Sequence, residues 1–378
     1  MSATFRYRFL AVLLFCFCLL PFLNCNTRPV GFDLIGSIPE EESIELPPDT
    51  IDSYAKFIPL STAPYLLLGK DNQYESRILL KFALKDSALD SVTAVHLILY
   101  PQGSYPQKFL CYPCSTDWSG SGVTWRMTDS LNQWVNPGGD YWHLLLCEGS
   151  LVKDSTVLQL NRDYLPTLVR HSYGIILLPV DTGFTTIVSL EKTSSSPRIV
   201  FSYLNGKKRT YYPTEDTHIV DSTNLGIYPE EILVGSSVAF RTYIHFSLES
   251  IPPAATVTRA ELKFKPLTVY RREDTIRLGV HRLTESYRTK GKYARFAPTA
   301  AGITRYVPLD TDTVVHLEIT SLVQEWVSRP DSSPNYGLLL TAEPEWLKPF
   351  RIKIFRSGPN SPKLKVSYLY PPEDRFSR

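Results

Sequence analysis

Short segments in which apolar and polar residues alternate recur along the chain, and they predict β-strands. The segment Thr258–Phe264 alternates in this way, and Pro362–Tyr370 is a strand led by a proline. In such strands one face packs inward while the other meets water or a partner, and a proline at the strand start costs little because only the first N–H is missing. Long helical periodicity is lacking, so the pattern predicts an all-β protein.

The two halves of the chain resemble each other at a nearly constant offset in residue number, which indicates an internal repeat. Chance similarity would scatter the offsets. Four segments of the first half recur in the second in the same order and at nearly the same spacing: Arg77–Phe82 with Arg241–Phe246, Ala94–Tyr100 with Ala260–Pro266, Tyr173–Leu178 with Tyr336–Leu340, and Ser196–Tyr203 with Ser361–Tyr368.

Each repeat contains several short strands punctuated by Gly, Pro and Ser, as in a β-sandwich or jelly roll. We therefore predict two tandem jelly-roll-like sandwiches, each with at most one short helix. The second should fold alone and superimpose on the first, with Arg77 and Arg241 on equivalent strands. The expected organisation is an acidic spacer over 26–46, a first sandwich over 47–204, a polar linker over 205–215, a second sandwich over 216–370 and a tail over 371–378.

The N-terminal residues 1–25 have the layout of a signal peptide, in which Arg6 and Arg8 precede the apolar run Phe9–Leu20. This run is shorter than the roughly 20 residues that a membrane span needs. We therefore expect an exported protein at the outer membrane or cell surface.

Phe22–Cys25 resembles a bacterial lipobox, in which the cysteine is acylated, although Phe22 and Asn24 depart from the usual pattern. We expect lipidation at Cys25, against plain cleavage or retention of the segment as an anchor. The stretch Arg28–Ala55 carries seven acidic residues and no basic residue after Arg28. Such a composition favours a solvated spacer between a lipid anchor and the folded body.

Charge is balanced overall and concentrated locally. The whole chain carries 40 basic and 38 acidic residues, and loss of Arg6 and Arg8 with the signal peptide leaves 38 of each. This balance argues against nucleic acid as a partner. The stretch Arg259–Arg295 holds eleven basic and four acidic residues. Arginine binds carboxylates in pairs of hydrogen bonds, so this stretch indicates an acidic polysaccharide as ligand, although charged edge strands that block aggregation are the alternative. The candidate ligand-binding residues are Arg271, Arg272, Arg277, Arg282 and Arg288.

Four tryptophans, Trp118, Trp125, Trp134 and Trp142, fall close together in sequence, and Tyr105, Tyr112 and Tyr141 lie nearby. Aromatic faces stack on the apolar faces of sugar rings, and a polar edge can remain wet. Trp118 and Trp125 are expected in the core. Trp134 lies in a polar, glycine-rich loop, and we expect it to be an exposed ligand-binding ring.

Cys111, Cys114 and Cys147 are the cysteines of the mature chain. In an oxidising compartment one disulfide with one spare thiol is expected, joining Cys147 to either Cys111 or Cys114. With His143 the spacing would also permit zinc, but on a strand His143 and Cys147 would lie about 13 Å apart. A redox pair would need a helix N-terminus, which this region lacks. We expect neither a metal nor a cofactor.

Catalytic signatures are weak in this sequence. It contains no G-x-S-x-G elbow, and its acidic residues single out no pair of the kind that glycoside hydrolysis requires. The sequence therefore favours a protein that is not an enzyme.

Three segments of the second repeat carry a resemblance to a known family: Ile319–Val327, Asn335–Leu339 and Ser361–Tyr368. Residues 216–370 resemble the DNRLRE domain, a family related to disaggregatase repeats and to a class of carbohydrate-binding modules. The first repeat is a weaker copy, because Pro166 stands where the second has a helix ending on Trp326. The resemblance implies a cell-surface lipoprotein that binds extracellular polysaccharide, or alternatively a structural spacer or assembly subunit without sugar binding.

Overall fold

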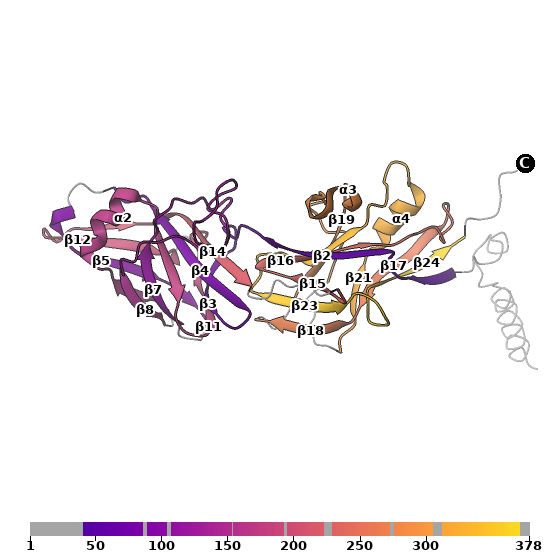
Figure 1. Ribbon diagram of the computed structural model, residues 1–378, viewed down its shortest axis with the longest axis horizontal. Helices are drawn as coiled ribbons and strands as arrows, with labels where there is room; N and C mark the ends of the chain where they lie inside the picture. The colour runs from indigo at the N-terminus through magenta and orange to yellow at the C-terminus, as the bar shows by residue number, and fades with distance from the viewer. Residues whose placement is uncertain are drawn as a thin grey trace, which may run out of the picture.

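The computed structural model describes residues 41–85, 89–103, 107–152, 154–192, 195–222, 229–272, 276–304 and 312–370. The protein is all-β, as the alternation predicts, and forms two β-sandwiches arranged end to end (Figure 1). The signal peptide, Cys25, Tyr105 and the predicted tail lie outside the described residues.

The first sandwich consists of two facing sheets with antiparallel strand pairs. The larger sheet has the order β6-β11-β3-β4-β10-β7-β8, with β14 alongside β4, and the smaller has the order β13-β12-β5-β9. The strands are β3 (Tyr65–Lys70), β4 (Tyr74–Phe82), β5 (Val92–Leu99), β6 (Pro101–Gln102), β7 (Gln107–Pro113), β8 (Cys147–Leu151), β9 (Thr156–Gln159), β10 (Ile175–Pro179), β11 (Gly183–Val188), β12 (Arg198–Tyr203), β13 (Lys208–Tyr211) and β14 (Pro213–Ser222).

The second sandwich repeats this arrangement. Its larger sheet has the order β18-β23-β15-β16-β22-β19-β20, with β2 alongside β16, and its smaller sheet has the order β1-β24-β17-β21. The strands are β1 (Glu41–Leu46), β2 (Thr50–Phe57), β15 (Glu231–Gly235), β16 (Val238–His245), β17 (Thr256–Phe264), β18 (Pro266–Arg271), β19 (Leu278–Arg282), β20 (Gly302–Ile303), β21 (Val315–Glu318), β22 (Leu338–Ala342), β23 (Phe350–Phe355) and β24 (Lys363–Leu369).

The two sandwiches exchange a pair of strands. Strand β2 pairs with β16 and β1 pairs with β24, so the N-terminal strands complete the second sandwich. The equivalent strands β14 and β13 pair with β4 and β12 and complete the first. Strands β1 and β13 begin at Glu41 and Lys208, and strands β2 and β14 begin at Thr50 and Pro213. In each pair the separation in residue number is close to the repeat offset. Each repeat is thus a strand pair followed by a body, and its pair completes the body of the other repeat.

This exchange corrects the predicted boundaries. Residues 41–46 form a strand rather than the end of the 26–46 spacer, and 50–57 belong to the second sandwich rather than to a first one over 47–204. The predicted linker over 205–215 contains β13 and the start of β14. Residues 216–370 are therefore not a complete sandwich. Three of the four exposed positions of β1 are glutamates, while Ile44 and Leu46 pack against the second core. The acidic composition therefore concealed a strand.

Arg77 and Arg241 lie on the equivalent strands β4 and β16, as the repeat predicts. Each of these strands has a long partner from the exchanged pair, β14 for the first and β2 for the second. The equivalence therefore holds for the topology of the two bodies.

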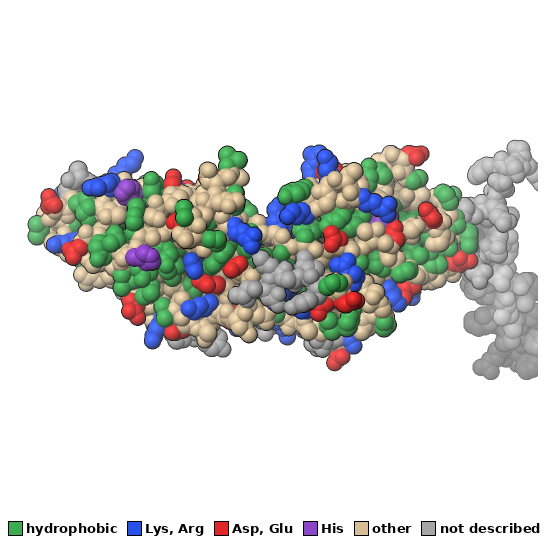
Figure 2. Space-filling model, viewed as in Figure 1, with side chains coloured by type: hydrophobic (Ala, Val, Ile, Leu, Met, Phe, Trp, Pro, Cys, Tyr) green, Lys and Arg blue, Asp and Glu red, His purple; other side chains and the backbone are tan. Residues whose placement is uncertain are grey.

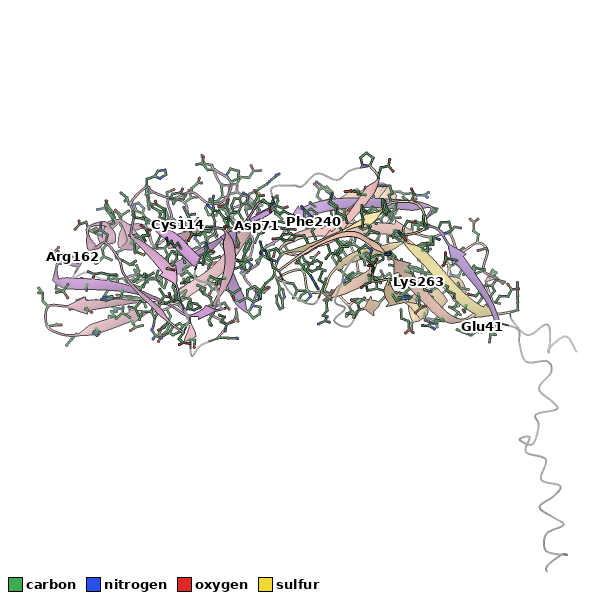
Figure 3. The ribbon with its side chains drawn as sticks, turned by 90° about the horizontal axis from the view of Figure 1, so that it is seen from below. Glu41, Asp71, Cys114, Arg162, Phe240 and Lys263 are labelled. Carbon is green, nitrogen blue, oxygen red and sulfur yellow. The ribbon has the colours of Figure 1, made fainter. Side chains whose placement is uncertain are left out.

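An apolar cluster joins the two sandwiches where they meet. Tyr74 and Val220 of the first sandwich pack with Leu233, Val238 and Phe240 of the second, and Figure 3 shows Phe240 beside the junction. Hydrogen bonds cross the same junction: the Tyr65 hydroxyl donates to the Trp346 carbonyl at 3.0 Å, and the Arg351 guanidinium donates to Gln73 Oε1 at 2.6 Å. Buried apolar contacts and crossing strands together oppose hinge motion between the sandwiches.

Helices are few and short in the described part of the chain. Helix α2 (Leu165–His171) keeps Pro166 in its first turn, where proline is tolerated. Helix α4 (Thr320–Ser328) buries Trp326 in the core, and no side chain caps its first turn. With the single-turn helix α3 (Tyr287–Lys290), the described part of the second sandwich has two helices, whereas at most one was predicted. The 3₁₀ turns among the described residues are η3 (Leu89–Ser91), η4 (Arg162–Tyr164) and η6 (Gly291–Tyr293).

The exchange also determines at which end of the molecule the first described strand lies. Glu41, the first described residue, lies at the outer end of the second sandwich, and Arg162 lies at the opposite end of the molecule in the first (Figure 3). The sandwich whose body comes first in sequence is therefore the one farther from Glu41.

Candidate functional site

The outer face of the larger sheet in the first sandwich is covered by the loop 115–146. Trp118, Trp125 and Trp134 of this loop pack with Leu79 and Ile176 of the sheet. They form an apolar layer on the outside of the sheet, whereas the core between the sheets is a separate cluster. Trp118 and Trp125 are thus buried, as expected, but outside the space between the two sheets.

The prediction that Trp134 is an exposed ligand-binding ring is wrong. Its side chain is only 5% exposed, and its indole N–H donates to the Thr124 carbonyl at 2.9 Å. The loop turns inward because the Asp140 carboxylate accepts the backbone N–H groups of Val135 and Asn136, each at 2.8 Å. Polar loop residues thus serve to fold the loop, and their composition gave a misleading impression of exposure.

Six other rings, three of them from the end of this loop, remain partly exposed. Tyr112 and Tyr141 stack with ring centroids 5.0 Å apart, and His143 meets Tyr141 edge-on at 5.2 Å. Trp142 lies 4.8 Å from His171 and stacks on Tyr173 at 6.5 Å with an interplanar angle of 16°. We call the set the aromatic platform: Tyr112, Tyr141, Trp142, His143, His171 and Tyr173.

Three separate segments build the aromatic platform. Tyr112 lies on β7, residues 141–143 precede β8, and His171 ends α2 with Tyr173 two residues beyond. The backbone N–H of Trp142 donates to the Pro113 carbonyl at 3.0 Å, and Tyr141 forms an isolated antiparallel β-bridge with Cys114. These contacts hold the loop against the end of β7. Tyr112, Tyr141 and Tyr173 pack against the same apolar layer as the buried tryptophans. The three tyrosine rings are therefore supported from below.

Sequence reasoning identified part of the aromatic platform. Tyr112, Tyr141 and Trp142 belong to the aromatic-rich stretch, but His171 and Tyr173 come from a distant segment and were missed as ligand residues. For Tyr112, the alternation of β7 indicates exposure, because neighbouring side chains of a strand point to opposite faces and Cys111 points inward.

The predicted basic residues of the second repeat do not form one site, because their partners lie on different elements. Arg282 donates to Glu325 on α4 at 2.8 Å, whereas Arg272 pairs with Asp71 in the turn between β3 and β4. Arg288 is 74% exposed, with its guanidinium 4.0 Å from Asp49. On the visible face of the second sandwich, blue cations stand among red carboxylates (Figure 2). Arg271 is exposed at the end of β18 and Arg277 is half-buried before β19.

Asp71 shows how strongly one of these pairs is held. Burial would raise the pKa of the Asp71 carboxyl, but hydrogen bonds from Tyr270, Arg272 and two backbone amides outweigh it and hold the pKa below its usual range. The Arg272 guanidinium also lies over the Phe184 ring at 5.1 Å. Arg272 is therefore part of the junction between the sandwiches.

The three cysteines are unbonded thiols on two different faces. Cys111 and Cys147 lie directly opposite each other on β7 and β8 and pack in the core between the sheets. Cys114 packs in the outer tryptophan layer, so of the two pairings left open, only Cys111 with Cys147 has the thiols on one face. Burial and the neighbouring Cys147 raise the pKa of Cys111, and burial raises the pKa of Cys114. Such thiols are poor nucleophiles at neutral pH.

Two titratable residues of β14 face the interior of the first sandwich. Asp216 lies opposite Leu80 and His218 opposite Ile78, both core residues. Burial raises the pKa of Asp216 to about 7 and lowers that of His218 to about 3. The Leu190 N–H donates to the Asp216 carboxyl at 2.6 Å. Asp216 Oδ1 and both ring nitrogens of His218 are buried without a hydrogen-bond partner, so the burial of these two side chains costs stability.

Across the described ranges, no three or more His, Cys, Asp and Glu side chains gather as they would around a metal ion. None of the helices in the described part of the chain is long and apolar enough to cross a membrane.

Comparison with known proteins leaves the family open. No family model and no curated protein matches this sequence. Among solved structures, a protein from Parabacteroides distasonis ATCC 8503 whose description infers that it is secreted is similar over 88% of this chain and 100% of its own, with 8% identity and a TM-score of 0.21. A structure of infectious bursal disease virus, Gx strain, is similar over 88% of this chain and 74% of its own, with 9% identity and a TM-score of 0.13. Both likenesses are too distant to assign a fold family or a function.

Proposed function

We propose that this protein binds extracellular polysaccharide through the aromatic platform of its first sandwich, without cleaving it. The observation that carries the proposal is two groups of three partly exposed rings, one around Tyr141 and one around Trp142, in which the tyrosine rings pack against the buried tryptophan layer. Aromatic faces pack against the C–H faces of sugars while hydroxyl and imidazole edges remain available for hydrogen bonds. Rings already packed against a buried layer lose little conformational freedom when a ligand binds.

The end-to-end arrangement suits such a role at a cell surface. If Cys25 is acylated, as we propose, the chain reaches the folded body at Glu41, and the first sandwich lies at the far end (Figure 3). The aromatic platform is then presented away from the membrane. The protein in this proposal is a lipid-anchored surface protein whose second sandwich also acts as a spacer.

A purely structural role is the second candidate, and the strand exchange favours it. Two sandwiches that complete each other and share an apolar junction form one rigid rod. Such a rod could serve as a spacer or assembly subunit without binding sugar. Binding measurements separate the two candidates.

The test compares Tyr141→Ala and Trp142→Ala with the parent protein by affinity electrophoresis through gels that contain neutral polysaccharides. Tyr293→Ala is the matched control, because Tyr293 is an exposed ring far along the chain from the aromatic platform. We expect each platform variant to weaken binding about tenfold, equivalent to roughly 1.4 kcal/mol, while the control migrates like the parent. Equal retardation of the parent and both platform variants would refute the proposal and leave the structural role.

A further inference from the structure

A pocket of about 190 Å³ lies on the outer face of the larger sheet in the second sandwich. Strand β19, the end of β22 and the residues just after it contribute to the lining, together with the chain between η6 and β20. The volume is below the roughly 300–1,000 Å³ of sites for drug-sized ligands, so the pocket suits one small unit. We call it the outer pocket, and its lining includes His281, Phe296, Pro298, Thr341, Glu343 and Glu345.

Two polar residues of the lining face away from the core between the sheets. Val280 of β19 and Leu340 of β22 belong to that core. Neighbouring side chains of a strand point to opposite faces, so His281 and Thr341 point to the outer face. They are only 4% and 2% exposed there. The outer pocket is therefore built on buried polar groups and not on solvated surface side chains.

His281 pairs with the first of two carboxylates in the outer pocket. Its Nε2 lies 3.0 Å from Glu343 Oε2, and its Nδ1 lies 2.8 Å from the Ala297 carbonyl oxygen. Burial would lower the pKa of His281, but the hydrogen bonds with Glu343 and Ala297 outweigh it and raise the pKa above its usual value. A Cβ at Gly279 would stand 3.1 Å from Glu343 Oε2, so the glycine leaves room for this pair. The pair engages Oε2, which leaves Glu343 Oε1 to accept from a ligand.

Arg241 holds the second carboxylate. Two nitrogens of its guanidinium donate to the two oxygens of Glu345, each at 2.7 Å. The same guanidinium lies over the Phe296 ring at 5.1 Å, and His281 meets that ring edge-on at 5.3 Å. Each carboxylate oxygen keeps a lone pair for a further hydrogen bond. Because Arg241 and His281 already pair with the two carboxylates, the outer pocket suits hydroxyl groups better than a charged ligand.

An unsatisfied hydroxyl lies in the same lining. Thr341 Oγ1 is buried and has no hydrogen-bond partner within the described ranges of the chain. A buried hydroxyl without a partner destabilises the folded protein. A ligand hydroxyl would satisfy it, because hydroxyl groups both donate and accept. Phe296 and Pro298 supply apolar surface beside these polar groups, and the C–H face of a sugar ring packs well on such surface.

The outer pocket and the aromatic platform lie on equivalent faces of the two sandwiches. Tyr112 of the platform lies opposite Ile176 on β10, and His281 of the pocket lies opposite Leu339 on β22. The repeat matches Ile176 with Leu339, since they stand at the same place in the matched segments that begin at Tyr173 and Tyr336. The repeat thus gives each sandwich a ligand surface at the same place, with rings in the first and hydrogen-bonding groups in the second.

We propose that the outer pocket binds an uncharged sugar unit and forms a second subsite for the polysaccharide. Glu343 and Glu345 accept from ring hydroxyls, Thr341 bonds to a further hydroxyl, and the C–H face of the ring packs on Phe296 and Pro298. This inference rests on the proposed function and deepens it by adding a subsite in the second sandwich and naming a neutral hexose as its ligand. Two linked subsites strengthen the binding of a polymer that reaches both.

The test is an NMR titration of the whole mature chain with the methyl glycosides of glucose, galactose and mannose. Thr341→Val removes the hydroxyl and nearly keeps the shape. Thr185→Val is the matched control, because Thr185 is 4% exposed, also has an unsatisfied Oγ1 and lies outside the outer pocket. Loss of an unsatisfied hydroxyl does not destabilise the fold, so both variants should unfold at a urea concentration equal to or higher than that of the parent.

We expect at least one methyl glycoside to bind the parent and Thr341→Val to weaken that binding at least threefold, while Thr185→Val leaves it unchanged. Equal binding by the parent and Thr341→Val overturns the assignment of the outer pocket. A parent that binds none of the three methyl glycosides overturns it as well, because the pocket then holds water only.

The two proposals fail in different ways. Retardation by a neutral polysaccharide that is lost in Trp142→Ala, together with no binding of any methyl glycoside, overturns the outer pocket and leaves the aromatic platform. Methyl glycoside binding that is weakened in Thr341→Val but kept in Trp142→Ala supports the outer pocket even if the aromatic platform binds nothing. A parent that binds neither the polymer nor a methyl glycoside overturns both proposals.

Discussion

Replacing Asp216 with Asn should make this protein more stable at pH 8 and remove a pH dependence that the wild-type chain carries. Asp216 is 2% exposed in the first sandwich, and burial raises its pKa to about 7 from the ordinary 3.8. A group whose pKa is raised on folding contributes fully to the free energy of unfolding at a pH below its unfolded pKa. For Asp216 this contribution is lost as the pH rises through the folded pKa of about 7. The rise in the pKa from 3.8 to about 7 corresponds to about 4 kcal/mol.

The amide that Asp216→Asn introduces never ionises, and its carbonyl oxygen can still accept the Leu190 N–H. The advantage of the variant over the parent should therefore grow by about 4 kcal/mol between about pH 4 and pH 8. His218 acts in the opposite direction, because burial lowers its pKa to about 3 and stability falls as the pH drops below about 6.5. His218 is present in both proteins, so its contribution cancels in the difference between them.

The assay is urea unfolding at pH 4, 6 and 8, followed by tryptophan fluorescence, for the parent, Asp216→Asn and the control Asp331→Asn. Asp331 is exposed, and such surface changes alter stability by no more than about 0.5 kcal/mol. The reasoning is refuted if the difference in unfolding free energy between Asp216→Asn and the parent is the same at pH 4 and pH 8.

Two further predictions concern the chain's cross-connections. Oxidation of the protein should join Cys111 to Cys147, which lie opposite each other on adjacent strands, and should add about 2–4 kcal/mol to the free energy of unfolding. Cys114 should then react with an alkylating reagent only after unfolding. Peptide mapping that finds Cys114 in a disulfide would contradict this. Deleting residues 41–57 should expose the second sandwich to protease while the first resists, because β16 and β24 each lose one neighbouring strand. Equal protease resistance of both sandwiches would show that the exchanged strands are dispensable.

Local pattern determined the fold class and the repeat. Alternation of apolar and polar residues is a property of neighbouring positions, so β-strands can be recognised without knowing their partners. The repeat placed Arg77 and Arg241 on equivalent strands. These results depend only on short stretches of chain and on their recurrence.

Tertiary structure alone decided which strands pair. Strand β2 begins at Thr50 and its partner β16 at Val238, in the other half of the chain. Either body offers an equivalent edge, so no local signal tells the N-terminal pair which one to join. Residues 41–46 resembled a spacer for the same reason: their acidic residues face solvent, and only the partner β24 makes the segment a strand.

The candidate sites divide in the same way. Tyr141 and Trp142 could be recognised as part of an aromatic-rich stretch of sequence. The exposure of a ring, however, depends on what its loop folds against, and Trp134 is buried for that reason. The ring of Tyr173 joins Trp142 from a segment distant in the chain. Likewise, the sequence showed a cluster of cations, yet their partners, such as Asp71 for Arg272, come from elements remote in the chain. Charge neutralisation and cleft formation are properties of surfaces that only folding brings together, so residue order determined the strands and three-dimensional packing determined the sites.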